Sequence, residues 1–153
     1  GEFLTDTRGT GVLNRVFHGW APYKGPIPGR RQGVLISMET GESVTYALWK
    51  LEDRGRMFIG GGEPIYQGMI IGEHSRDNDL EVNPLKGKQL TNIRAAGKDE
   101  AVKLTPPTRL SLEAAIAYIT DDELVEVTPK AIRLRKALLD PHERKRAMRN
   151  AAD

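Results

Sequence analysis

Three neighbouring residues near the middle of the chain are of the types found in a nucleophilic catalytic triad: His74, Ser75 and Asp77. Residues so close together on one segment rarely converge with the geometry that a triad needs. A hydrogen-bonded structural turn is therefore the favoured interpretation. An enzyme that acts on a small molecule, centred on Glu73, His74 and Ser75, remains a less favoured alternative, and saturable turnover by this chain would support it.

Clustered glycines that could cradle a phosphate occur at Gly60-Gly61-Gly62. Glu63 and Pro64 follow them, and both are unsuitable next to a phosphate. The sequence contains no Gly-x-x-x-x-Gly-Lys-Ser/Thr string, the motif of a nucleotide-phosphate loop. We therefore interpret the glycines as a turn between strands, and we expect neither nucleotide binding nor a cofactor in this chain.

Metal ligands are few and badly spaced. The three histidines, His18, His74 and His142, show no His-x-x-x-His spacing, and the chain has no cysteine, so a zinc site is not expected. The acidic run Asp121-Asp122-Glu123 lacks the alternating ligands of a calcium loop. We interpret that run as a solvated corner between a helix and a strand.

Basic side chains are more informative, because they gather in two stretches although the net charge of the chain is only +2. The first set comprises Lys86, Lys88, Arg94, Lys98 and Lys103. The second comprises Lys130, Arg133, Arg135, Lys136, Arg144, Lys145, Arg146 and Arg149. Basic patches on loops and open helices favour the phosphate backbone of nucleic acids. RNA binding is the resulting hypothesis, and a solvated charged face is its alternative.

The elements that must position these side chains indicate an α+β fold, a mainly β compact domain with a few short helices. Apolar runs and alternation predict strands over 33–38, 57–59, 69–74, 124–127 and 132–135. In the last of these, Ile132 and Leu134 point one way and Arg133 and Arg135 the other. Helices are expected after the caps Ser111 and Asp140, whereas residues 44–49 suit a strand or a helix. Residues 86–107 are expected to form a long surface loop.

The first thirty residues differ from the rest. Residues 2–9 suit a short helix that ends at Gly9, and 10–18 suit a strand. Closely spaced prolines and glycines make 21–32 a linker. We therefore place a domain boundary near 28, with a compact domain over about 29–139. The chain has no initiator Met and is expected to be an excised piece, whose strand-bearing remnant exposes an edge.

Several longer strings go beyond composition. Residues 4–11 (LTDTRGTG) resemble the last helix-to-strand segment of the domain that follows the G module in ribosomal translocase-type GTPases. Five further strings resemble the TypA/BipA family, at 31–37 (RQGVLIS), 51–55 (LEDRG), 72–80 (GEHSRDNDL), 86–94 (KGKQLTNIR) and 121–129 (DDELVEVTP). Because these strings are spread along nearly all of the chain, from residue 4 to residue 129, the resemblance extends over both expected domains.

The resemblance implies the C-terminal part of a bacterial translational GTPase that takes part in stress response, low-temperature growth and ribosome assembly. On this basis 1–28 is a remnant of an elongation-factor-like domain plus linker. Residues 29–153 are the family's special C-terminal domain, with a basic terminal helix at about 140–150. The fragment would not be an enzyme, since the G domain that binds GTP and Mg is absent from it. The protein would be cytoplasmic, with no membrane partner.

In that family a long loop reaches the acceptor end of an A-site tRNA near the peptidyl-transferase centre. The expected partners are thus the bacterial ribosome, that tRNA and ribosomal RNA. Carried over by motif and charge, the expected RNA-binding residues are Lys86, Lys88, Asn92, Arg94, Lys98, Lys103, Arg133 and Arg135. A monomer is expected, although the exposed edge could pair with a second copy. A protein–protein adaptor that uses the acidic corner at 121–126 is the alternative function.

Overall fold

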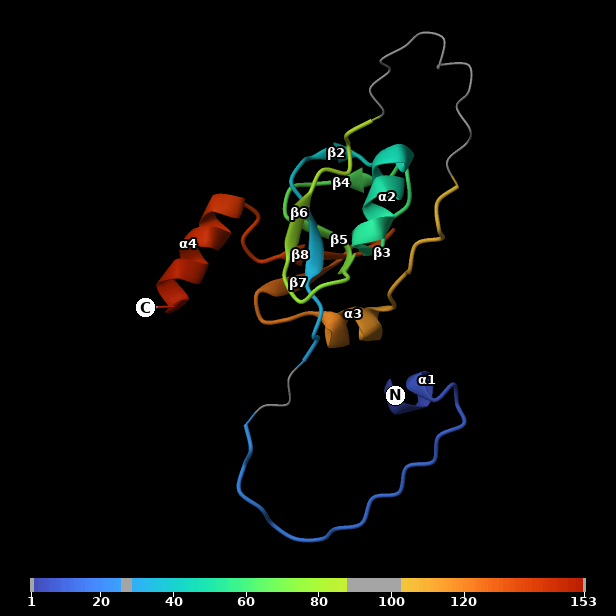
Figure 1. Ribbon diagram of the computed structural model, residues 1–153, viewed down its shortest axis with the longest axis vertical. Coiled ribbons are helices and arrows are strands. Elements are labelled where there is room, and N and C mark those ends of the chain that lie inside the picture. The colour runs from blue at the N-terminus through green and yellow to red at the C-terminus, as the bar shows by residue number, and fades with distance from the viewer. Residues whose placement is uncertain (1, 26–28, 88–102, 153) are drawn as a thin grey trace.

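The computed structural model describes residues 2–25, 29–87 and 103–152 (Figure 1). Its strands are β1 (Val34–Ser37), β2 (Gly41–Glu42), β3 (Gly55–Met57), β4 (Pro64–Ile65), β5 (Met69–His74), β6 (Leu80–Val82), β7 (Glu123–Val127) and β8 (Ile132–Lys136). Its helices are α1 (Glu2–Asp6), α2 (Thr45–Leu51), the 3-10 turn η1 (Glu52–Arg54), α3 (Leu112–Tyr118) and α4 (Pro141–Ala152). The predicted α+β class, mainly strands with a few short helices, is confirmed.

Strand β5 is the centre of a six-stranded sheet with the order β6-β1-β5-β8-β7. It pairs with antiparallel β1 along one edge. Two strands share its other edge end to end: β8 pairs with Met69 and Ile70, and β3 pairs with the residues from Gly72 to His74. β6 runs parallel to β1, and β7 is antiparallel to β8. The short strands β2 and β4 form a separate pair.

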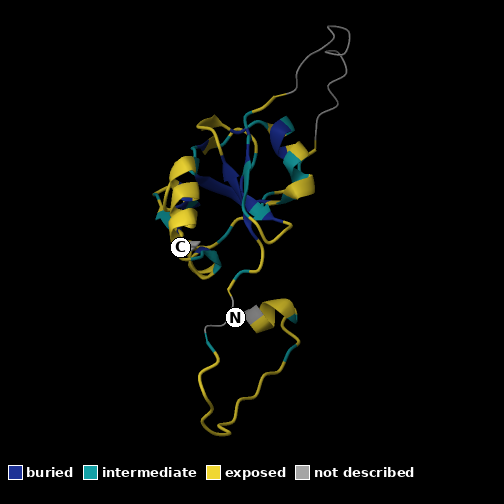
Figure 2. Cartoon of the chain, turned by 60° about the vertical axis from the view of Figure 1, so that its left-hand side comes forward, coloured by how far each residue is buried: buried dark blue, intermediate teal, exposed yellow. Residues whose placement is uncertain are grey.

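Both faces of the sheet are covered, which explains why β1 and β5 are almost entirely buried and rich in apolar residues. On one face Leu35 and Ile71 pack with Leu48 of α2. On the other face Val34, Ile36, Ile70 and Leu134 pack with Ala115 of α3. Alternate residues of each strand therefore supply opposite cores, as the two-residue period of a strand requires. Figure 2 shows these buried strands between more exposed helices.

The ambiguous stretch at 44–49 proves to be helical. α2 buries Ala47 and Leu48 against the sheet and leaves Trp49 and Lys50 exposed. Two adjacent buried residues followed by two exposed ones suit a helix face, because a strand would alternate them. The predicted strand at 57–59 is instead Gly55–Met57. The strands predicted at 33–38, 69–74, 124–127 and 132–135 are confirmed within a residue or two.

The two predicted helix caps are also present. Ser111 precedes α3, and its side chain accepts a hydrogen bond from the backbone N–H of Ala114 at 3.2 Å. Asp140 precedes α4, and its Oδ1 atom accepts from the N–H of His142 at 2.6 Å. Both bonds satisfy backbone donors that a first helical turn otherwise leaves open.

The N-terminal segment matches its prediction only in part. α1 ends at Asp6, earlier than the predicted end at Gly9, and a turn with Arg8 and Gly9 at positive φ follows it. The strand expected over 10–18 is wrong, because those residues pair with no strand in the described part of the chain. Val16 and Trp20 are 89% and 96% exposed, so this apolar stretch has no core to join here (Figure 2). The domain boundary near residue 28 stays a prediction.

Candidate nucleic-acid interface

The basic segment predicted to contact RNA starts and ends on one apolar cluster. Leu85 and Leu104 both pack against the core around Leu48 and Ile71, on the α2 side of the sheet. Lys86 and Lys103 lie next to these anchors, and both are exposed. The structure therefore places these two predicted residues beside one apolar cluster, at the two described ends of the basic segment.

Hydrogen bonds fix both ends of this segment. The Oδ1 atom of Asn83 accepts from the N–H of Leu85 at 2.9 Å. Glu52 of η1 accepts from the N–H of Thr105 at 2.7 Å. The predicted residues Lys88, Asn92, Arg94 and Lys98 lie outside the described residues. What the described part shows is a firmly held base with a cation at each end.

Arg133 and Arg135 lie on β8, on the face opposite the buried Leu134, as the alternation predicted. Both are half-buried. Cross-strand pairing places Glu126 opposite Arg133, and Glu126 accepts a hydrogen bond from the Tyr66 hydroxyl at 2.6 Å. Burial, together with that bond to a carboxylate, raises the pKa of Tyr66, so the hydroxyl stays a donor. The two arginines thus lie on a two-stranded hairpin, with Glu126 opposite Arg133.

The acidic corner is solvated only in part, because Asp121 and Asp122 are exposed but Glu123 is buried, and Asp122 and Glu123 belong to one charge network. Glu123 is 2% exposed, and it accepts two hydrogen bonds of 2.8 Å from the guanidinium of Arg30. Lys136 is also 2% exposed. Its Nζ atom lies 2.6 Å from Asp79, 2.8 Å from Asp122 and 2.9 Å from Glu123. We call these five residues the buried charge network.

Mutual hydrogen bonds keep the network ionised. Burial alone would raise the pKa of Glu123, but hydrogen bonds from Arg30 and Lys136 outweigh it, and the pKa lies below its ordinary value. For Lys136 burial opposes the charge, yet bonds to Asp122, Asp79 and Glu123 hold its pKa above the ordinary value. Lys136 therefore does not belong to the exposed basic set in which the sequence placed it. Its position two residues after Leu134 was the signal that it faces inward.

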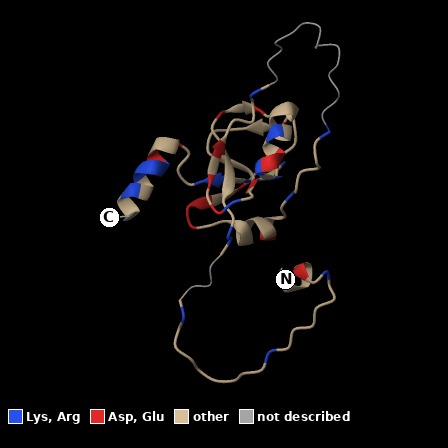
Figure 3. Cartoon of the chain, viewed as in Figure 1, with Lys and Arg blue, Asp and Glu red and all other residues tan. Residues whose placement is uncertain are grey.

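Arg144 is a second basic residue that the structure removes from the exposed set. It is 8% exposed, and its Nη1 atom donates to the carbonyl oxygens of Leu138 and Leu139, each at 2.7 Å. Its Nη2 atom lies 2.8 Å from Glu81 at the end of the sheet. Arg144 therefore attaches α4 to the domain. The other basic residues of α4, namely Lys145, Arg146 and Arg149, are exposed (Figure 3).

Of the residues considered for catalysis, His74 forms a local hydrogen bond within the turn that follows β5. His74 is buried in β5, and its Nδ1 atom lies 2.5 Å from the carbonyl oxygen of Asn78, to which it donates. Ser75 and Asp77 are exposed in the turn that follows. The hydrogen-bonded turn favoured from the sequence is thus confirmed. The glycine triplet also forms a turn, at Gly61 and Gly62.

Among the described residues, no group of three or more His, Cys, Asp or Glu side chains is arranged to hold a metal ion. In the buried charge network, the ammonium of Lys136 already lies between the carboxylates. Within the same described ranges, no helix has the length and apolar character needed to cross a membrane.

Comparison with known proteins identifies the class. Residues 32–141 match the TypA/BipA C-terminal domain. The chain is 54% identical over 150 residues to the large ribosomal subunit assembly factor BipA of Haemophilus influenzae, and 52% identical over 153 residues to the protein of that name from Escherichia coli K12. The matched protein of Salmonella typhimurium is 53% identical over 149 residues.

These alignments cover 97–99% of the chain but only 24–25% of each relative. The chain therefore spans about a quarter of the length of the curated relatives it matches. The extent of the match and the identity show that the chain belongs to the TypA/BipA family, as the resemblance implied, and corresponds to its C-terminal domain.

Proposed function

We propose that this chain is the RNA-contacting, ribosome-docking part of a large-subunit assembly factor. Its relatives carry that name. Its partners would be the bacterial ribosome, ribosomal RNA and the acceptor end of an A-site tRNA, all in the cytoplasm. Roles in stress response and low-temperature growth belong to the same proposal.

The observation that carries this proposal is the base of the basic segment. Leu85 and Leu104 hold the two ends of the segment on one rigid core, and Lys86 and Lys103 stand exposed beside them. Because the backbone next to Lys86 and Lys103 is already held on the core, these cations can neutralise phosphates with little further loss of backbone conformational entropy. The basic residues between these two lysines are part of the same proposal, since RNA recognition uses shape and single-stranded ends.

We further propose that the chain has no catalytic role of its own. The sequence has no phosphate-loop motif, and His74, the central residue of the enzyme alternative, is bonded within its own turn. GTP and Mg would act in the G domain of the longer protein. The adaptor alternative loses support at the acidic corner, because Asp122, Glu123 and Glu126 are all engaged by neighbouring side chains.

Sedimentation of the chain with purified large ribosomal subunits at several salt concentrations tests the proposal. In the variant K86A/K103A we expect weaker binding and a flatter dependence of log K on log salt. Each lost phosphate contact removes about 0.7–0.9 of slope, so two contacts remove about 1.5. Thermal unfolding should change little, because exposed substitutions usually alter stability by less than about 0.5 kcal/mol each.

The matched control is K145A/R149A, which removes the same charge from exposed positions of α4 and leaves Arg144 in place. This control should bind like the unaltered chain. If K86A/K103A keeps its affinity and slope while the α4 variant loses both, the RNA contact is on the terminal helix and the assignment to the segment base is wrong.

A further inference from the structure

A cleft of about 840 Å³ opens where the sheet splits. Both β3 and β8 pair with the same edge of β5, but at different ends of it. Beyond these pairings the two strands separate. The residues that follow β3 line one side, and the start of β8 with the β7–β8 turn lines the other.

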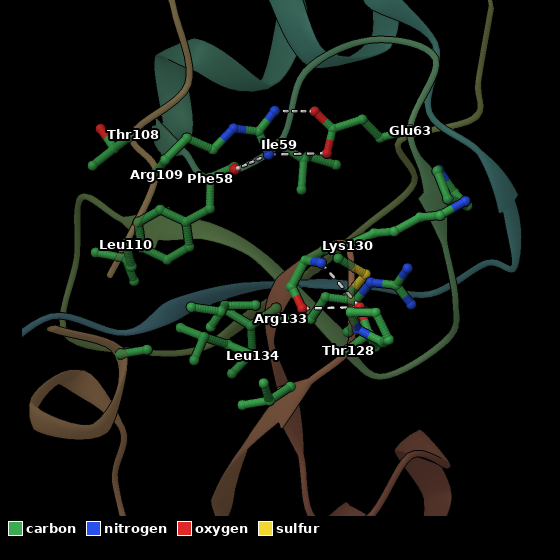
Figure 4. A pocket seen from close by; sticks show the side chains of 18 residues that line it. Phe58, Ile59, Glu63, Thr108, Arg109, Leu110, Thr128, Lys130, Arg133 and Leu134 are labelled. Atoms are coloured by element: carbon green, nitrogen blue, oxygen red, sulfur yellow. Dashed lines mark hydrogen bonds and ion pairs between the residues drawn. The ribbon is translucent and has the colours of Figure 1, made fainter. Parts of the chain in front are cut away.

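The wall that follows β3 is firmly built. The N–H of Thr108 donates to the carbonyl oxygen of Met57 at 2.9 Å, and Nη1 of Arg109 donates to that of Phe58 at 3.2 Å. Arg109 also forms a two-bond ion pair with Glu63, which lowers the pKa of that carboxyl. Figure 4 shows this pair across the cleft from Lys130 and Arg133.

The opposite wall contains a short open strand edge. The pairing of β5 with β8 stops at Ile70 and Leu134. On the β5 side of β8, the N–H of Lys136 donates to the carbonyl oxygen of Gly68. On the β7 side, the carbonyl oxygen of Ala131 accepts from the N–H of Thr128, and the N–H of Ala137 donates to the carbonyl oxygen of Asp122. Because backbone groups alternate sides along a strand, those of Ile132 point to the β5 side, beyond the last pair. Ile132 lines the cleft and is 39% exposed.

The lining combines an apolar floor with net positive charge. Phe58 and Leu134 are buried, and Leu110 is half-buried. The charged residues that line the cleft are Glu63, Arg109, Lys130 and Arg133, which sum to +2. Arg109 is neutralised by Glu63, and Arg133 lies opposite Glu126, so Lys130 in the β7–β8 turn carries the least balanced charge of this lining.

We propose that this cleft binds an extended acidic segment of a protein partner, which adds as a short strand to β8. The open backbone of Ile132 selects a peptide, because strand addition uses an N–H and a C=O together. The apolar floor accepts one side chain of that segment, and Lys130 and Arg133 face the carboxylates on either side of it. The proposal is independent of RNA binding by the basic segment.

The test uses a capped octapeptide of alternating Val and Glu, with the whole chain labelled for amide NMR. Shifts should be concentrated at Ile132, Leu134 and the residues around Phe58. A peptide with Lys in place of Glu should bind at least tenfold more weakly. N-methylation of the peptide backbone should also weaken binding about tenfold, since it removes a strand hydrogen bond without altering the protein.

The variant K130E should weaken the Glu peptide about fivefold, which corresponds to about 1 kcal/mol for a pair near the surface. The matched charge reversal K145E on α4, and the segment variant K86A/K103A, should leave peptide binding unchanged. Equal binding of the Lys and Glu peptides, shifts confined to other surfaces, or absence of binding at millimolar peptide would overturn the proposal. If oligouridine of equal charge displaces the peptide from the cleft and binds more tightly than the peptide does, the proposal is wrong and the cleft is an RNA site.

Discussion

Replacement of Lys136 by Met is the most demanding perturbation of the buried charge network. The network contains two cations, Arg30 and Lys136, and three carboxylates, Asp79, Asp122 and Glu123. Its formal charge is −1. Met keeps the length and apolar stem of the side chain but removes the ammonium, so the formal charge becomes −2 at a site that is largely closed to water.

The cost follows from how far each carboxylate is exposed. Removing one partner of a buried ion pair costs about 3–5 kcal/mol. The side chain of Glu123 is 0% exposed and that of Asp79 is 25% exposed, whereas that of Asp122 is 58% exposed and is screened by water. Arg30 still pairs with Glu123 in the variant. We therefore expect K136M to lower the free energy of unfolding by about 3 kcal/mol, the low end of that range. This loss is a large share of the about 5–15 kcal/mol that stabilises a typical domain.

Urea unfolding followed by circular dichroism measures this loss. The matched control is K130M, which removes the same charge from an exposed position in the β7–β8 turn and should cost less than about 0.5 kcal/mol. Adding E123Q to K136M should cost less than the sum of the single changes, because both remove parts of one network. Equal losses for K136M and K130M, or strict additivity with E123Q, would refute the claim that this network is a coupled, buried unit.

Two further outcomes follow from the same contacts. The free energy of unfolding in urea should be retained above the ordinary pKa values of 3.8 for Asp122 and 4.5 for Glu123, and should decline as the pH falls through their lowered folded values. The reason is that carboxyl groups with a lowered pKa stabilise the folded state only while they are ionised. Urea titrations at intervals of one pH unit check this, and constant stability down to pH 2 would contradict it. R144A should speed amide exchange in α4 about tenfold or more, since hydrogen bonds to charged groups contribute about 1.5–3 kcal/mol to stability. R149A, at an exposed position, should leave the exchange rate unchanged. Equal exchange rates in the two variants would show that Arg144 does not hold the helix on the domain.

Local sequence patterns predicted most elements because their physical causes are local. The caps Ser111 and Asp140 act within three residues, and the apolar run of β5 reflects its place between two cores. The stretch at 44–49 stayed ambiguous because its apolar residues suit both periods. Packing against the neighbouring sheet selects the helix, because only a helix lets the adjacent residues Ala47 and Leu48 both face the sheet. The strand expected at 10–18 failed for a related reason, as a strand requires a partner that the described chain does not supply.

The candidate site was less accessible to sequence reasoning than the fold. Lys136 and Arg144 were counted as exposed cations, yet each is bound by residues distant in sequence, Asp79 and Glu81 respectively. Such pairing depends on which strand ends meet, and residue type or spacing does not reveal it. Arg30, in the predicted linker, was missed as a structural residue for the same reason. The orientation of Arg133 and Arg135 was predicted correctly, because alternation along one strand is enough to fix it.

The structure also limits how much binding the described cations can explain. Of the predicted RNA-binding residues, the four within the described ranges are Lys86, Lys103, Arg133 and Arg135. If each contacts one phosphate, together they produce a salt slope of about −3. Burial of Lys136 and Arg144 means that neither adds to it. A slope steeper than about −4 for this chain on ribosomal RNA would therefore require phosphate contacts from cations beyond these four, and the exposed side chains of α4 would be the first to examine.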